Sequence, residues 1–163
     1  MSAHIHAAAL IAVVLFSGAL LSKATTTEAF ISCLVYSLTA VLVFFVSSFY
    51  HYLHDGFGIS EKMRDILEIA DHISIYLFIA GSYTAVMINL IDAPWKYSFL
   101  TIVWATALFG VTYSATHHRL PQWAKSRALY TALFILLGWT FLLRVEEIFQ
   151  AMTCLLYTSP SPR

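Results

Sequence analysis

Ser47, His51 and Asp71 are the residues whose types and spacing best suit chemistry. Ser47 and His51 close a long apolar run in the stretch SSFYH, and Asp71 opens the next apolar run. Residues four apart on a helix share one face, and a short antiparallel connection would bring Asp71 alongside that face. An imidazole ligates zinc, a carboxylate binds the metal or orients its water, and a hydroxyl holds that water. The three residues therefore suit part of a hydrolytic zinc site.

A structural interpretation of the same residues stands beside this one. Asp71 would cap the N-terminus of a helix that begins there, where its charge meets the helix dipole, and His51 would hydrogen-bond a lipid headgroup. A catalytic zinc usually has three protein ligands, and this set does not supply three. Spacing alone therefore favours the structural interpretation.

The composition of the chain indicates the solvent in which these residues lie. Of 163 residues, 60% are hydrophobic and 11% are charged, against roughly 25% charged in soluble domains. Nine Lys and Arg balance nine Asp and Glu, so no basic face for nucleic acid is predicted. The two cysteines, Cys33 and Cys154, predict no disulfide framework. The chain is typical of a membrane protein.

Five nearly uncharged runs predict membrane-spanning helices, because crossing the hydrocarbon takes roughly 17 to 25 residues. No Lys or Arg precedes the first run and no small-residue cleavage site follows it, so we interpret it as a membrane helix and not as a cleaved signal. The sequence thus predicts an all-α integral membrane protein. The runs are Ile5 to Leu21, Ala29 to Tyr50, Ile73 to Leu90, Tyr97 to Tyr113 and Ala128 to Leu143.

The basic residues between the runs indicate an orientation, since Lys and Arg are retained on the cytoplasmic side. A cytoplasmic N-terminus is favoured, in the plasma (inner) membrane, with SSFYH and Asp71 on the cytoplasmic face. The inside segments would then carry Lys62, Arg64, Arg119, Lys125 and Arg127, and the outside segments Lys23, Lys96 and Arg144.

The link between the second and third runs predicts a short amphipathic helix along the membrane interface, separate from the spanning helix that Asp71 begins. Ser60 is its expected N-cap, and Glu61 suits the first turn. Within the third run, Gly81 is expected to permit close helix packing.

Three stretches resemble the hemolysin III family, within the larger progestin and adipoQ receptor family of membrane proteins. They are SSFYH (47–51), ADHISIYLFIAGSYTA (70–85) and ALYTALFILLGW (128–139), in the family's order and spacing over about residues 5–148. The resemblance implies a bundle of seven helices and a zinc ion near the cytoplasmic side. Three histidines hold that zinc in the family, one from the second helix and two from a His-x-x-x-His motif on the seventh.

Carried onto this sequence, the resemblance makes His51 a zinc ligand. Asp71 would bind or orient the zinc-bound water, and Ser47 would support that water by hydrogen bonding. His6 matches a histidine at the start of the family's first helix. No His-x-x-x-His occurs in the sequence, and the nearest substitute is the adjacent pair His117 and His118.

The last ten residues, CLLYTSPSPR (154–163), break the family pattern and resemble a translated transposase adapter. We therefore interpret residues 1–153 as a C-terminally truncated domain holding helices one to five, and residues 154–163 as a read-through tail. With two of three histidine ligands missing, we expect the 163-residue chain to bind zinc weakly or not at all and to be inactive.

The function that the resemblance implies for the full-length protein is zinc-dependent hydrolysis of an amide or ester of a membrane lipid. Zinc would generate hydroxide, with Asp71 as base or orienter. A non-enzymatic receptor or regulator with a closed, structural zinc site is an alternative. Membrane permeabilisation (cytolysis) is another, but it needs a polar pore stripe that these runs lack. The expected partners are the lipid bilayer and a lipid substrate.

Overall fold

The computed structural model describes residues 2–56, 58–91, 94–116 and 127–140, together with 142, 145, 146, 149 and 150. Five α-helices and no strand occur among them, which confirms the all-α prediction. The helices are α1 (Ser2–Ser22), α2 (Thr27–Gly56), α3 (Glu61–Leu90), α4 (Trp95–Thr116) and α5 (Arg127–Trp139).

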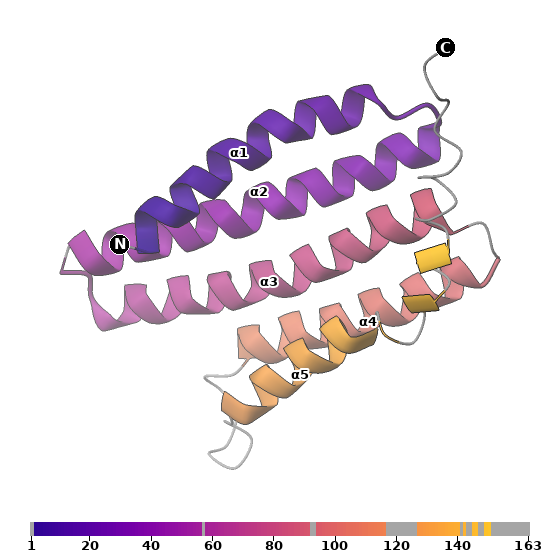
Figure 1. Ribbon diagram of the computed structural model, residues 1–163. Helices are drawn as coiled ribbons and strands as arrows, with labels where there is room; N and C mark the ends of the chain where they lie inside the picture. The colour runs from indigo at the N-terminus through magenta and orange to yellow at the C-terminus, as the bar shows by residue number, and fades with distance from the viewer. Residues whose placement is uncertain are drawn as a thin grey trace.

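The first four helices lie side by side in chain order, each antiparallel to the next, and α5 packs against α4 and α3 (Figure 1). The start of α1, the end of α2 and the start of α3 therefore meet at one end of the bundle, which we call the His51 end. The end of α1 and the start of α2 lie at the opposite end, which we call the Lys23 end.

Four of the helices have the length and composition of membrane spans: His4–Ser22, Thr27–His54, Glu61–Leu90 and Trp95–Thr116. The fifth predicted run begins as α5, whose 13 residues rise about 20 Å. The described part of that run ends before a full span is complete. The membrane architecture is confirmed with four span-length helices among the five.

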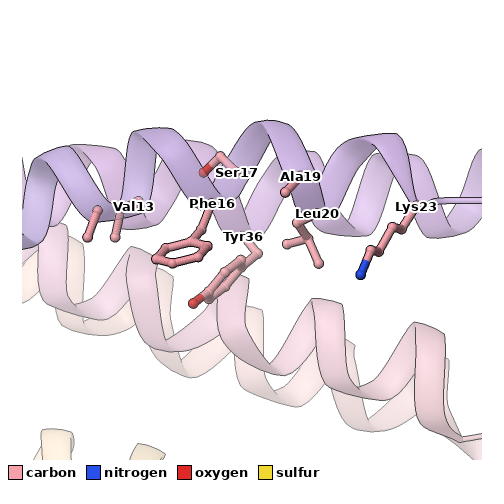
Figure 2. Close-up of a pocket in the computed structure, with 8 residues that line it drawn as sticks. Val13, Phe16, Ser17, Ala19, Leu20, Lys23 and Tyr36 are labelled. Carbon is pink, nitrogen blue, oxygen red and sulfur yellow. The ribbon is translucent and has the colours of Figure 1, made fainter.

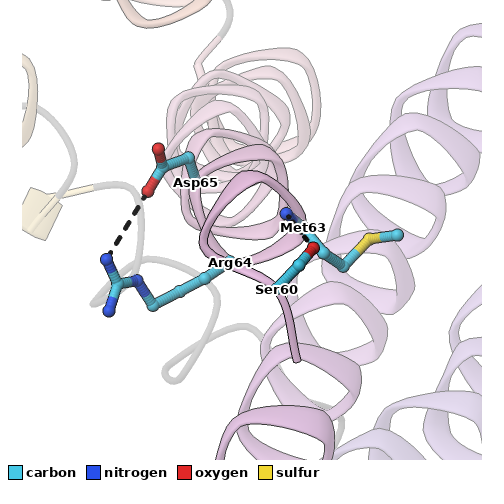
Figure 3. Close-up of polar contacts among 4 residues, drawn as sticks. All are labelled: Ser60, Met63, Arg64 and Asp65. Carbon is cyan, nitrogen blue, oxygen red and sulfur yellow. Dashed lines mark hydrogen bonds and ion pairs between the residues drawn. The ribbon is translucent and has the colours of Figure 1, made fainter. Parts of the chain in front are cut away.

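The separate interfacial helix predicted before Asp71 was wrong, because α3 is one continuous helix of 30 residues that begins at Glu61. No glycine or proline follows Ser60 until well inside the span, so nothing interrupts the helix. Ser60 is the N-cap as predicted, and its Oγ accepts a hydrogen bond from the Met63 amide at 3.3 Å (Figure 3). Arg64 and Asp65 follow on the exposed surface, 3.9 Å apart.

Glycines allow the helices to approach closely at two seams. A Cβ atom on Gly81 would overlap the side chain of Thr39 on α2, which confirms the packing role predicted for Gly81. At the α3–α4 seam, a Cβ atom on Gly110 would overlap the ring of Tyr76, which is fully buried. Small residues at such contacts are the usual means of tight packing between membrane helices.

Hydrogen bonds between side chains join the same helices. Asn89 on α3 donates to Ser32 Oγ on α2 at 2.8 Å, and the indole of Trp104 on α4 donates to Thr84 Oγ1 at 3.0 Å. Polar groups inside a membrane protein need such internal partners because the hydrocarbon offers none.

Tyr83 holds the end of α5 against α3. Its hydroxyl contacts the carbonyl oxygens of Leu137 and Gly138 at 3.1 and 2.9 Å and accepts a hydrogen bond from Thr140 at 3.0 Å. These bonds satisfy carbonyls at a helix end, where intrahelical donors are missing.

Removing this hydroxyl by Tyr83→Phe is expected to destabilise the bundle by about 0.6 to 1.7 kcal/mol, the range for hydrogen bonds between membrane helices. Thermal unfolding in detergent would measure the change. Tyr97→Phe is the matched control, because the Tyr97 hydroxyl lies at the exposed surface, 3.4 Å from Glu28. Equal effects of the two substitutions would contradict the role given to Tyr83.

Candidate functional site

The register between α2 and α3 determines which residues meet at the His51 end. The hydrogen bond between Ser32 and Asn89 fixes one level of this antiparallel pair. Both helices rise about 1.5 Å per residue, so equal counts from that level reach equal depths. Counting from this pair toward the His51 end brings His51 of α2 to within one residue of the level of Asp71 of α3.

Two serines lie about one turn deeper on the same two helices. By the same count Ser47 of α2 is level with Ser74 of α3, and both side chains are buried, at 6% and 1% exposure. The Ser74 hydroxyl donates to the backbone oxygen of Asp71 at 2.7 Å. A layer of buried hydroxyl groups thus lies beneath His51 and Asp71.

His51 is half-buried, and a second histidine packs flat against it. The rings of His51 and His6 are 5.3 Å apart with an angle of 9° between their planes. Tyr50 contacts the His51 ring as well, at 5.2 Å between ring centroids. His6 comes from the start of α1, so the site draws on three helices and not only two.

The contact between His6 and His51 was missed by sequence reasoning, which matched His6 only to a family histidine. The order and direction of the predicted helices could have indicated this contact. Both residues lie near the same end of two consecutive antiparallel runs, and a short connection brings such ends together.

Asp71 lies inside α3, ten residues after its first residue, and is half-buried. The interpretation of Asp71 as an N-cap was therefore wrong, because Ser60 holds that position. The Asp71 carboxylate makes no ion pair with another described residue.

The other histidines of the described region face elsewhere. His72 turns toward α5, where its ring stacks on Phe134 at 6.2 Å, and its Nδ1 lies 2.7 Å from the Glu68 carbonyl oxygen. His72 thus points away from the side of α3 that faces α2. His54 is exposed on the last turns of α2, next to the Tyr50 ring. His117 and His118 lie outside the described residues.

The donor set at the His51 end suits zinc in kind, since imidazole nitrogen and carboxylate oxygen are both zinc ligands. The set contains too few ligands to hold a zinc ion. Across the part of the chain that the structure describes, no group of three His, Cys, Asp or Glu side chains is placed to hold a metal ion. The arrangement provides one end of a possible ligand shell, with His51 and Asp71 at one depth and Ser47 below them.

A family model described as "Haemolysin-III related" matches residues 1–159. The chain is 26% identical to Hemolysin-3 of Bacillus cereus over 132 residues, which cover 81% of this chain and 56% of that protein. It is 25% identical to the Hemolysin-3 homolog of Bacillus subtilis (strain 168) over 123 residues, 76% and 53% of the two chains. The chain spans about half the length of the curated relatives it matches. No solved structure matches it.

Proposed function

Because this chain belongs to the haemolysin III family of integral membrane proteins, we propose that the complete protein is a zinc-dependent hydrolase of a membrane lipid amide or ester. The observation that carries the proposal is the common depth of His51 and Asp71 at one end of the bundle, above the buried Ser47. A metal ligand, a carboxylate and a hydroxyl at similar depths on neighbouring helices are components that metal-assisted hydrolysis uses.

Each residue has a distinct task in this proposal. His51 would supply one imidazole to a zinc ion, which would need further ligands from outside the described residues. Bound zinc supplies a Lewis acid and a source of hydroxide at neutral pH. Asp71 would orient a water at this site and accept its proton, because a carboxylate in reach of a water can act as general base. Ser47 hydrogen-bonds the same water from below.

His6 is a positioning residue for His51 in this scheme. The two rings lie nearly parallel, so the His6 ring restricts rotation of the His51 imidazole. Partners that fix the orientation of a ligating histidine contribute measurably to metal affinity.

The proposed site faces the cytoplasm, with the N-terminus on that side of the plasma membrane. Lys62 and Arg64 support this orientation, since both are exposed in the first turn of α3 at the His51 end. Basic residues next to a span favour the cytoplasmic side.

Asp71→Asn in the complete protein is expected to lower the hydrolysis rate about 10²- to 10⁴-fold, the usual contribution of a general base, while zinc remains bound. Zinc content by elemental analysis and release of fatty acid from lipid amides and esters would measure both quantities. His54→Ala is the control, because His54 is exposed on the same end of α2. Unchanged hydrolysis in Asp71→Asn would contradict the proposal.

The alternative functions give different results in the same experiment. Stoichiometric zinc without lipid turnover would indicate a receptor or regulator. Leakage of a dye from vesicles, independent of zinc, would indicate a membrane-permeabilising protein.

A further inference from the structure

Two adjoining cavities lie along α1 toward the Lys23 end. The first has a volume of about 410 Å³ and lies between the α1 stretch from Ala12 to Lys23 and the Tyr36 side chain of α2 (Figure 2). The second, of about 520 Å³, extends onto α3. Leu20, Lys23 and Tyr36 line both cavities. The two therefore form one continuous groove, which we call the α1 groove.

The body of the α1 groove is apolar. Val13, Phe16 and Leu20 line its side on α1 (Figure 2), and the Phe16 side chain is 72% exposed. The described helices leave no residue in the apolar window of the span His4–Ser22 fully buried. An apolar groove along a helix of span length matches the chemistry of a lipid acyl chain.

One end of the groove carries a positive charge. Lys23 lies in the turn directly after α1, where its amide hydrogen-bonds the Leu20 carbonyl at 3.2 Å. Its side chain is exposed and makes no ion pair with any described residue. Glu28, an acidic side chain of the same end, contacts Tyr97 on α4 instead. The Lys23 ammonium is therefore available to an anionic group at headgroup depth, where basic side chains attract anionic lipids.

The length of the groove matches one leaflet. The rise of α1 from Ala12 to Lys23 is about 16 Å, and half of the hydrocarbon thickness is about 15 Å. A chain whose headgroup contacts Lys23 would reach the middle of the bilayer at Ala12. The groove thus has the polarity and length of a site for a single acyl chain.

We propose that the α1 groove binds one acyl chain of an anionic phospholipid from the leaflet on the Lys23 side, with the lipid phosphate against Lys23. This site is separate from the one proposed for hydrolysis. His6 on the same helix lies at the opposite end of the bundle, against His51.

Native mass spectrometry of the protein, exchanged into mixed micelles containing phosphatidylglycerol or phosphatidylcholine, tests the proposal. One retained phosphatidylglycerol and little phosphatidylcholine are expected. Lys23→Gln should lower phosphatidylglycerol retention about fivefold, the contribution of one basic residue near an anionic lipid surface. Lys96→Gln is the matched control, because Lys96 lies at the same end but over the Tyr97 ring, and it should retain the lipid as the unaltered protein does.

Val13→Trp provides a second variant that leaves the charge unchanged and fills the deep part of the groove. It should reduce retention of phosphatidylglycerol while the circular dichroism of the helices stays unchanged. Equal retention of the two phospholipids, or equal effects of Lys23→Gln and Lys96→Gln, would overturn the proposal. Retention of free oleate in place of phospholipid, or of no lipid at all, would overturn it as well.

Discussion

Gly110→Ala is expected to destabilise the bundle by about 1 to 3 kcal/mol, the usual cost of overpacking a filled core. The added methyl group would overlap the Tyr76 ring at the α3–α4 seam. Tyr76 has no room to move aside, because its side chain is fully buried and its ring stacks on Phe134 of α5 at 4.4 Å. The strain therefore reaches three helices. Unfolding in detergent, followed by circular dichroism, would measure it.

Gly18→Ala is the matched control, since Gly18 also lies inside a membrane helix and nothing would lie within 4 Å of an added methyl group. Alanine in a helix interior is favoured over glycine by roughly 0.5 to 1 kcal/mol. The control should thus be neutral or stabilising. A Gly110→Ala protein as stable as the Gly18→Ala protein would show that the seam tolerates the methyl group.

His51→Ala is expected to have the largest effect on metal binding, with zinc affinity of the complete protein lowered by more than about 100-fold. Removing a direct ligand should exceed the 10- to 100-fold loss that removal of a ligand's partner causes. His6→Ala, which removes only the ring stacked on His51, should fall within that smaller range. Competition with a chromogenic chelator would measure both affinities.

His4→Ala is the control for both substitutions, because His4 belongs to the same first turns of α1 and its side chain is exposed. Its zinc affinity should equal that of the unaltered protein. Stoichiometric, tight zinc in the His51→Ala protein would remove His51 from the ligand set.

The spanning helices were predictable because the hydrocarbon demands long uncharged runs, and α1, α2 and α4 follow those runs closely. The start of α3 was not predictable from the sequence. Its first ten residues are charged and amphipathic, and polarity alone suggested a separate element at the interface. Helix continuity depends on the absence of a breaker after Ser60 and not on hydrophobicity, so the helix runs through Asp71 without interruption.

The candidate site was predictable where it depends on one helix and unpredictable where it depends on contacts between helices. Ser47 and His51 were expected on one face from their spacing, and both lie on α2. The stacking of His6 on His51 depends on how α1 and α2 are aligned. That alignment arises from side-chain packing along the whole interface, which periodicity does not encode.

The length of the continuous helix α3 also allows the depth of Asp71 in the membrane to be estimated. Its 30 residues rise about 45 Å, which exceeds a hydrocarbon layer of about 30 Å by roughly ten residues. With the Leu90 end at one hydrocarbon boundary, the excess is the charged segment 61–70, and Asp71 lies at the other boundary. Lipids carry their ester and amide linkages at this level, between the acyl chains and the hydrated headgroups. The first turns of α3 thus act as a spacer that would place the Asp71 carboxylate at the depth of these linkages, where the hydrolysis proposed above would take place.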